Sequence, residues 1–351
     1  MKTTFVSTSA VNSALRYSIL RQQAELTRAQ KEATTGFVAD RGLALGARTA
    51  QSVTLNRDLE RLNGIVDSNG LVSSRLAATQ KGLRQIGESA QTFLSSLTSS
   101  ASGDAAYALT QKSARATLDM LTSVLNTSLN GEYLFAGTNT DVKPINDFTP
   151  GSATKNDFDA KFATYFGFDQ NDPQAKNITT AQMQGFITTV VEPSFLGTGW
   201  TDPANPWSNA TDQGITSRIT LNETTETSVS ANDVGIRKVA MAAAVISDLL
   251  ASNVGDDARK VLVNFGVSTI GAGISDLGQL ESRTGIIEQR VSNATERVEM
   301  QIDLFERQIL STEGVDPYEA STRVTDLLSQ IEKSYAITAR IQQLSILNYI
   351  T

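Results

Sequence analysis

Two long apolar seams constrain this chain more than any other feature of its sequence. The first consists of eleven positions spaced alternately by three and four residues, and nine are apolar: Leu62, Ile65, Val72, Leu76, Leu83, Ile86, Ala90, Phe93 and Leu97. A second seam of the same period includes Val263, Ile270, Leu277, Leu280, Ile287, Val291, Ala294, Val298 and Phe305. This spacing is typical of coiled-coil helices, which must bury the stripe against a partner. The sequence therefore predicts two long helices, distant in the chain, that pack on each other.

The predicted fold is mainly α. We expect an elongated antiparallel helical bundle or coiled coil built from the N- and C-terminal segments, with a smaller β-rich inserted domain. The chain of 351 residues divides into five predicted parts. They are an N-terminal helix and loop (1–48), the first half of a helical rod (49–140), a variable inserted domain (141–232), the second half of the rod (233–312) and a C-terminal helix (313–351).

Local signals set the expected element boundaries. Gly36 should end a first helix, and a long helix should run from about Thr49 to Thr98. Asn130 and Gly131 tolerate the left-handed conformation, so they are expected to close a later helix before a strand over 132–137. Asp316 and the following Pro should start the last helix.

The second seam contains five glycines between 266 and 285, which in a helix cost about 1 kcal/mol each relative to alanine. They indicate either very close packing of two helices or an interrupted helix, and the sequence leaves both open.

The segment 141–232 differs from the rest in composition. It holds six of the seven prolines, both tryptophans, and 11 acidic against 5 basic residues, a net charge of −6 out of −7 for the whole chain. An alternating stretch over 215–221 predicts a half-exposed strand. Trp200 and Trp207 are candidate platforms for a glycan, although tryptophans close to prolines more often pack locally.

Composition also limits the chemistry. The chain has no cysteine and no histidine, which removes thiolate catalysis, Ser-His-Asp triads and Cys/His zinc sites, including a His-based protease motif in the inserted domain. No pair of carboxylates is set apart as an acid and base. We therefore expect no enzyme, no catalytic residue, no cofactor and no metal.

The charge pattern argues against binding to nucleic acid, and the hydropathy pattern argues against a membrane-spanning segment. No basic cluster with interleaved aromatic residues suits a nucleic acid. The longest apolar run, 239–246, is far shorter than the ~20 residues of a membrane span. The N-terminus lacks the apolar stretch of a cleaved signal peptide.

The stretch from Asn130 to Asp141, Asn-Gly-Glu-Tyr-Leu-Phe-Ala-Gly-Thr-Asn-Thr-Asp, follows a predicted helix and resembles the flagellin superfamily, within it most closely the hook-associated proteins at the hook–filament junction. Thr34-Thr35-Gly36 is similar to the turn after the first helix of these proteins, and the segment from Ser334 to Ile350 resembles their last helix. Where the family has a paired-Asp stretch, this chain has Asp40-Arg41 instead. The resemblance covers about 1–141 and 233–351.

The resemblance implies a structural role in an extracellular bacterial flagellum, reached by type III export without a cleaved signal. It implies flagellin, another hook-associated protein and further copies in a ring or tubular layer as neighbours, and an export chaperone. It also implies terminal segments that are mobile in the monomer and pair on assembly. Opposite net charges, +3 over 1–39 and −2 over 313–351, favour that pairing modestly.

The candidate assembly residues are apolar positions of the two terminal helices: Leu15, Ile19, Leu26, Leu328, Ile331, Tyr335, Ile341 and Leu344. An ordinary intramolecular core would show the same pattern. Two other functions stay open: a filament-forming flagellin, and a surface adhesin or glycan-binding module in the inserted domain.

Overall fold

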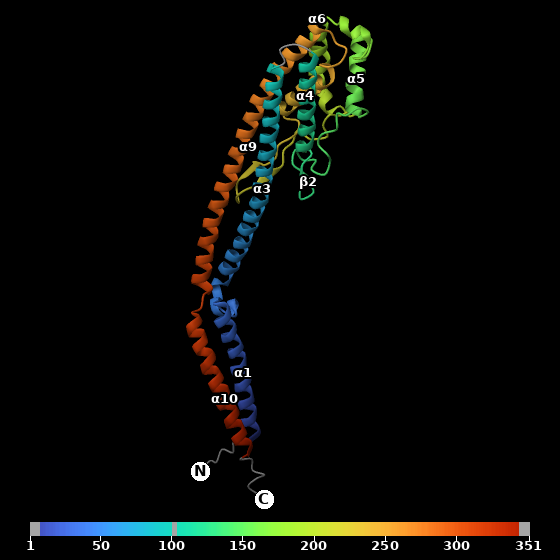
Figure 1. The fold of residues 1–351 in the computed structure, drawn as a ribbon. Helices are drawn as coiled ribbons and strands as arrows, with labels where there is room; N and C mark the ends of the chain where they lie inside the picture. The colour runs from blue at the N-terminus through green and yellow to red at the C-terminus, as the bar shows by residue number, and fades with distance from the viewer. Residues whose placement is uncertain (1–7, 100–103, 344–351) are drawn as a thin grey trace, which may run out of the picture. The chain divides into compact units, whose positions relative to one another are not determined.

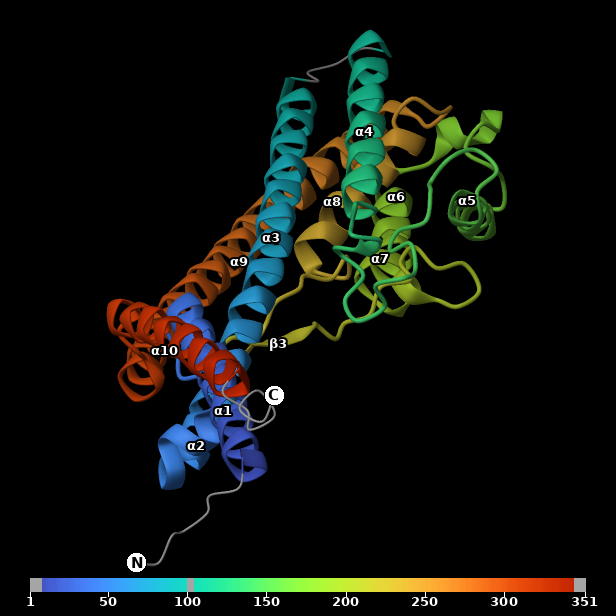
Figure 2. The same ribbon diagram turned by 90° about the horizontal axis from the view of Figure 1, so that it is seen from below.

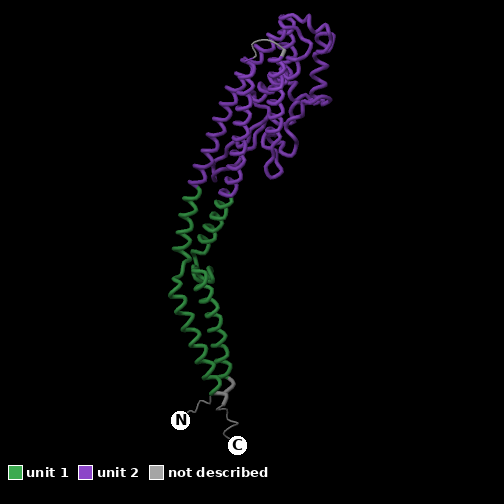
Figure 3. Tube along the Cα trace, in the orientation of Figure 1, with its two compact units in different colours: residues 1–64, 298–351 green, residues 65–297 purple. Residues whose placement is uncertain are grey.

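The computed structural model of the protein describes residues 8–99 and 104–343 (Figure 1). The chain forms two compact units (Figure 3). Unit 1 comprises 1–64 and 298–351, and unit 2 comprises 65–297. The mainly α fold with a few short strands agrees with the prediction. The division into five parts remains a proposal.

Unit 1 contains the terminal helices and the ends of two long ones. Its elements are α1 (Thr8–Thr35), α2 (Arg41–Leu45), the 3₁₀ turn η1 (Gly46–Arg48), the start of α3 (Thr49–Ser99), the end of α9 (Asp256–Glu313) and α10 (Pro317–Gln343). Gly36 ends α1 in the left-handed region, at φ +72°, where its N–H donates to the Glu32 carbonyl over 2.9 Å. Asp316 caps α10 by accepting from the Tyr318 N–H over 2.8 Å. Both predicted boundaries are confirmed.

Unit 2 is built around the remaining parts of α3 and α9. Two further helices, α4 (Asp104–Leu125) and α8 (Val234–Leu249), pack with them. Figures 1 and 2 show α4 and α8 beside the α3–α9 pair, with the inserted segment on one side of it. The first predicted seam is buried along its length apart from the partly buried Val72. The two polar positions of that seam are buried as well. Asn69 donates to the Ile219 carbonyl and to Thr295 Oγ1, each over 3.0 Å, while Thr79 bonds its own helix.

Helix α9 runs without interruption through its five glycines. A Cβ on Gly266 would lie 3.2 Å from both Ile246 and Leu97, and one on Gly273 would lie 3.1 Å from Val239. A Cβ on Gly271 or Gly278 would meet nothing within 4 Å. Close packing of α9 against α8 and α3 therefore explains part of the glycine content, and burial of the seam offsets the low helix propensity of the rest.

The stretch around Asn130 forms a hairpin rather than a helix end. Helix α4 ends at Leu125, and β1 (Ser128–Leu129) pairs with β2 (Glu132–Tyr133) through a turn in which Asn130 and Gly131 both have positive φ. The prediction that these two residues close the helix was wrong, because a two-residue hairpin turn requires the same left-handed conformation.

The residues after β2 fasten the two ends of the inserted segment. The Phe135 carbonyl accepts from the Ala231 N–H over 2.7 Å, and the Ala136 carbonyl accepts from the Thr211 N–H over 3.1 Å. A Cβ on Gly137 would lie 2.4 Å from the Thr211 carbonyl oxygen, so glycine is required there. The predicted strand over 132–137 is thus regular only at β2, and the rest is buried and bonded to the returning chain.

The inserted segment contains more helix than the sequence predicts. Its elements are α5 (Ala153–Phe166), η2 (Pro173–Asn177), α6 (Thr180–Phe186), the π-helical η3 (Ile187–Val191), α7 (Glu192–Leu196), η4 (Thr198–Thr201), β3 (Thr216–Arg218) and β4 (Thr224–Glu226). Phe158, Phe162 and Phe166 recur every four residues, a helical spacing that places them on one face of α5. Strand β3 lies in the first half of the predicted strand over 215–221.

The β3–β4 hairpin closes against the two long helices. Ile219, at its tip, is buried with Leu76, Val291 and Ala294 in a small apolar cluster. Glu223 accepts from Arg290 over 2.7 Å and from Arg297 over 2.8 Å, so the hairpin is held by α9. The inserted segment is therefore attached to the long helices through this hairpin, in addition to the backbone bonds that join its ends.

Asp248 makes the stability of unit 2 depend on pH. Burial raises the pKa of the Asp248 carboxyl above its ordinary value of 3.8, although Lys155, 3.0 Å away, opposes the shift. A raised folded-state pKa means that the native state binds the proton more tightly, so this contribution to stability is present below pH 3.8 and is lost as the pH rises through the folded-state pKa.

We expect Asp248→Asn to remove this titration. The free energy of unfolding of the wild type should fall relative to that of the variant as the pH rises from about 3.5, and the difference should become constant above the raised pKa. Denaturant unfolding at a series of pH values, followed by the fluorescence of the buried Trp200 and Trp207, measures it. Parallel pH profiles of the two proteins would contradict the assignment.

Candidate functional site

The terminal helices α1 and α10 pack on each other in an antiparallel pair. Three contacts show the direction: Arg323 lies 3.3 Å from Glu32, Ser334 donates to Gln22 over 3.2 Å, and Gln23 donates to Tyr335 Oη over 2.8 Å. Residue numbers rise along α10 as they fall along α1. The helices that the sequence proposes for assembly thus lie together in unit 1.

The apolar seam between these helices is thin. Its buried members are Ile19, Ala29, Ala320, Leu327 and Ile331. Two of the five are alanines, which bury little area, and polar side chains such as Gln22 and Ser334 continue the seam. Because burial contributes about 25 cal/mol per Å² of apolar area, a seam of this kind gives the pair modest stability.

The structure divides the predicted site residues into two groups. Ile19 and Ile331 are buried between the helices and Leu15 and Leu26 are half-buried, as an intramolecular core would have them. Leu328 and Tyr335, in contrast, are 43% and 51% exposed. The side chain of Ile341 and the whole of Leu344 lie outside the described residues.

Sequence reasoning missed Leu327, the buried leucine beside Leu328. A signal for it was present: Ala320, Val324, Leu327 and Ile331 follow the three-four spacing that also marks the long helices. Ala320 was missed because a small residue contributes little to an apolar pattern, and Ala29, which fits the helical spacing of the first helix, was not chosen as an assembly residue.

Large apolar side chains also lie outside the seam. On α1, Tyr17 and Leu20 are exposed, and on α10 Ile337 is exposed along with Leu328 and Tyr335. A groove of about 910 Å³ between the two helices is lined by Asn12, Arg16, Ile19, Leu20, Gln23, Tyr335, Thr338 and Ala339. Exposed apolar side chains around a groove are suited to bind a further apolar helix.

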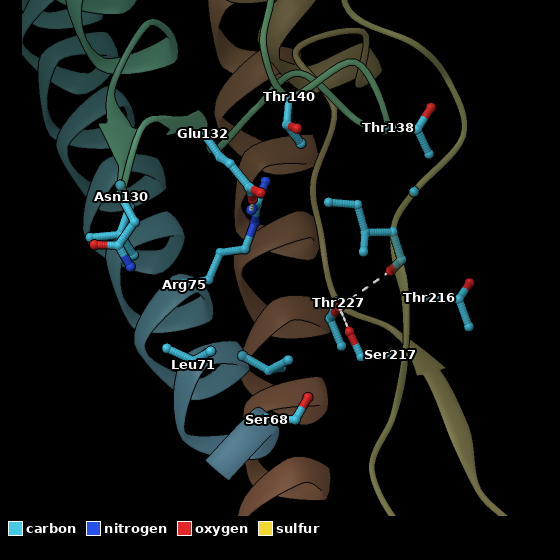
Figure 4. A pocket seen from close by; sticks show the side chains of 14 residues that line it. Ser68, Leu71, Arg75, Asn130, Glu132, Thr138, Thr140, Thr216, Ser217 and Thr227 are labelled. Carbon is cyan, nitrogen blue, oxygen red and sulfur yellow. Dashed lines mark hydrogen bonds and ion pairs between the residues drawn. The ribbon is translucent and has the colours of Figure 1, made fainter. Parts of the chain in front are cut away.

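A second hollow, of about 630 Å³, lies in unit 2 between α3, the β1–β2 hairpin and β3 (Figure 4). Its lining is rich in hydroxyl groups, from Ser68, Thr138, Thr140, Thr216, Ser217 and Thr227. The lining cation Arg75 is engaged, donating to Glu132 over 2.6 Å and to the Tyr133 carbonyl over 2.9 Å. We find no nucleophile with an adjacent base among these lining residues.

The two tryptophans are not surface platforms. Trp200 and Trp207 are buried and stacked with ring centroids 5.9 Å apart, and the Arg237 guanidinium lies 5.7 Å from the Trp200 ring. Local packing, the alternative weighed from the sequence, is what the structure shows, and it removes the platforms on which a glycan-binding module was based.

Two further findings concern metals and membranes. Within 8–99 and 104–343, no group of three or more His, Cys, Asp or Glu side chains is arranged to hold a metal ion. One described helix, α9, is long and apolar enough to cross a membrane by length and composition. This is weak evidence, because a core helix passes the same test, and α9 contributes Leu262, Ile270 and Leu277 to the buried core of unit 2.

Comparison with known proteins matches both ends of the chain. The family model of the bacterial flagellin N-terminal helical region matches residues 6–140, and that of the bacterial flagellin C-terminal helical region matches residues 267–350. Together they cover more than half of the 351 residues. No curated protein matches the chain.

Among solved structures, the chain is similar to one assigned as a flagellar hook-associated protein from Vibrio parahaemolyticus, with a TM-score of 0.51 and 10% sequence identity. The match covers 75% of this chain and 96% of that chain. At this identity the likeness shows a shared fold.

The neighbours Leu327 and Leu328 allow a matched test of the helix pair. Leu327 is 8% exposed, so Leu327→Asp places a charge in the seam and should cost about 3 kcal/mol, enough to separate α1 from α10. Leu328→Asp should change the stability by less than about 1 kcal/mol. Limited proteolysis within α1 measures the difference, and equal protection of the two variants would contradict the described seam.

Proposed function

The chain belongs to the flagellin family and is a structural protein of the bacterial flagellum, and from this premise we propose that it acts at the junction between hook and filament, as hook-associated protein 3. In this role it joins its neighbours through the terminal helices and catalyses no reaction.

One observation carries the assembly part of the proposal. The α1–α10 pair has a thin seam and exposes Tyr17, Leu20, Leu328, Tyr335 and Ile337. Two helices with apolar side chains on their outer faces are an incomplete bundle, which gains buried area when further helices cover those faces. Helices of neighbouring copies in a tubular layer provide such cover.

The proposed partners follow from this role. They are flagellin on the filament side, another hook-associated protein on the hook side, further copies of this chain in a ring or tubular layer, and an export chaperone before assembly. The chain would leave the cell through the flagellar export channel, without a cleaved signal peptide.

A filament-forming flagellin is the second candidate. It is favoured by the two matched family models, which are those of bacterial flagellin. Both candidates use the same terminal helices, so they differ in the extent of assembly rather than in its contacts.

The assembly surface is tested by Leu328→Asp. Because Leu328 lies outside the buried seam, the variant should keep the wild-type fold, and the added charge should prevent a neighbouring apolar surface from covering it. We expect incorporation into flagella, measured by immunoblotting of purified filaments, to fall at least about tenfold, a cost of about 1.4 kcal/mol. Exposed Ser18→Asp on α1 is the matched control, and normal motility of the Leu328 variant would contradict the role.

The two candidates are separated by a strain that lacks this protein. Loss of a junction protein should leave hooks without filaments, with flagellin released into the medium, as seen by electron microscopy. In a second assay, the purified chain is added to filament seeds. Elongation without limit would identify a filament flagellin and overturn the junction role, whereas a short terminal layer would support it.

A further inference from the structure

The two connections within unit 1 meet and are joined. Residues 36–40 connect α1 to α2, and residues 314–316 connect α9 to α10. The Val38 N–H donates to the Glu313 carbonyl and the Val315 N–H donates to the Gly36 carbonyl, both over 2.9 Å, and Phe37 forms an antiparallel bridge with Gly314. Two segments that are nearly 300 residues apart in the chain therefore share one set of backbone bonds.

Glu313, the last residue of α9, places a fully buried carboxylate at this point. Its residue exposure is 0%; Oε1 accepts two hydrogen bonds, whereas Oε2 accepts no hydrogen bond from the described residues and has an ion-pair contact instead. Ser52 Oγ donates to Oε1, as does Asn56 Nδ2 over 3.0 Å, and Arg41 Nε lies 2.7 Å from Oε2. The two hydrogen-bond donors lie on α3 and the ion-pair partner lies on α2, so a single side chain connects the end of α9 to two other elements.

The surrounding backbone leaves little freedom. A Cβ on Gly314 would lie 2.3 Å from the Leu310 carbonyl oxygen, so no side chain fits after the carboxylate. On the facing segment the Ala39 N–H donates to Glu32 over 3.2 Å, and Glu32 also pairs with Arg323 of α10. Polar bonds thus continue from the connections into the α1–α10 pair.

We infer that Glu313 is a latch that fastens the ends of α1, α9 and α10 to α2 and α3. Its carboxylate is costly to bury without partners, so the buried position is stable only while Arg41, Ser52 and Asn56 surround it. The latch converts two separate chain connections into one joint and holds α1 and α10 as a single paired element. Its consequence for assembly rests on the proposed function, but its existence does not.

The asymmetry of the ion pair makes the latch testable. Glu313 is fully buried, whereas the Arg41 side chain is 48% exposed and can reach water. Arg41→Gln should therefore leave a buried charge with only neutral donors, while Glu313→Gln removes that charge and keeps an acceptor for Ser52 and Asn56. The double variant should resemble Glu313→Gln, because it lacks the uncompensated charge.

The readout is hydrogen exchange of the Val38 and Val315 amides in the full-length chain, since these amides form the joint. We expect Arg41→Gln to accelerate their exchange by about tenfold or more, Glu313→Gln to accelerate it less, and the two changes to be strongly non-additive. Exchange of the buried α8 amides in unit 2 should not change. Glu306→Gln, at an exposed position of α9, is the control and should match the wild type.

Three outcomes would overturn the latch: no acceleration in Arg41→Gln, additive effects in the double variant, or equal acceleration in α8, which would indicate general unfolding. The test is independent of the flagellar role. Normal incorporation of Leu328→Asp would overturn the proposed function and leave the latch standing. Unchanged exchange of the Val38 and Val315 amides in Arg41→Gln would overturn the latch and leave the proposed function standing.

Discussion

The antiparallel packing of α3 on α9 is the interaction on which the rest of the structure depends. Each helix carries a three-four seam, and neither could stay folded alone with its apolar stripe in water. Because these helices come from opposite halves of the sequence, their pairing brings distant segments together. The hairpin tip at Ile219, the helices α4 and α8, and the inserted segment all pack on the surface that this pairing creates.

Much of this arrangement could be predicted from the sequence because it depends on periodicity and on capping residues. The helix predicted from about Thr49 to Thr98 agrees closely with α3, and Gly36 and Asp316 predicted two helix boundaries. These are local signals. Each results from a preference of one residue type for one backbone conformation or one face of a helix.

Other features depended on tertiary contacts and could not be predicted in this way. Asn130 and Gly131 favour positive φ, but that preference does not distinguish a helix end from a hairpin turn. The glycines of α9 could be interpreted only once Ile246, Leu97 and Val239 were placed beside them. At the terminal pair, sequence pattern selected Leu328 rather than its buried neighbour Leu327, and no signal indicated that Glu313 would be the buried carboxylate among so many acidic residues.

The bond between the Phe135 carbonyl and the Ala231 amide has a consequence for how such a chain can change over evolution. It holds the two ends of the inserted segment side by side. The entropic cost of closing this loop is therefore offset by bonds outside the segment's interior. Lengthening a closed loop is inexpensive, about 0.6 kcal/mol for each doubling. A gene of this design can therefore accept additional residues between these two points at little entropic cost, while selection preserves the helices that carry the segment.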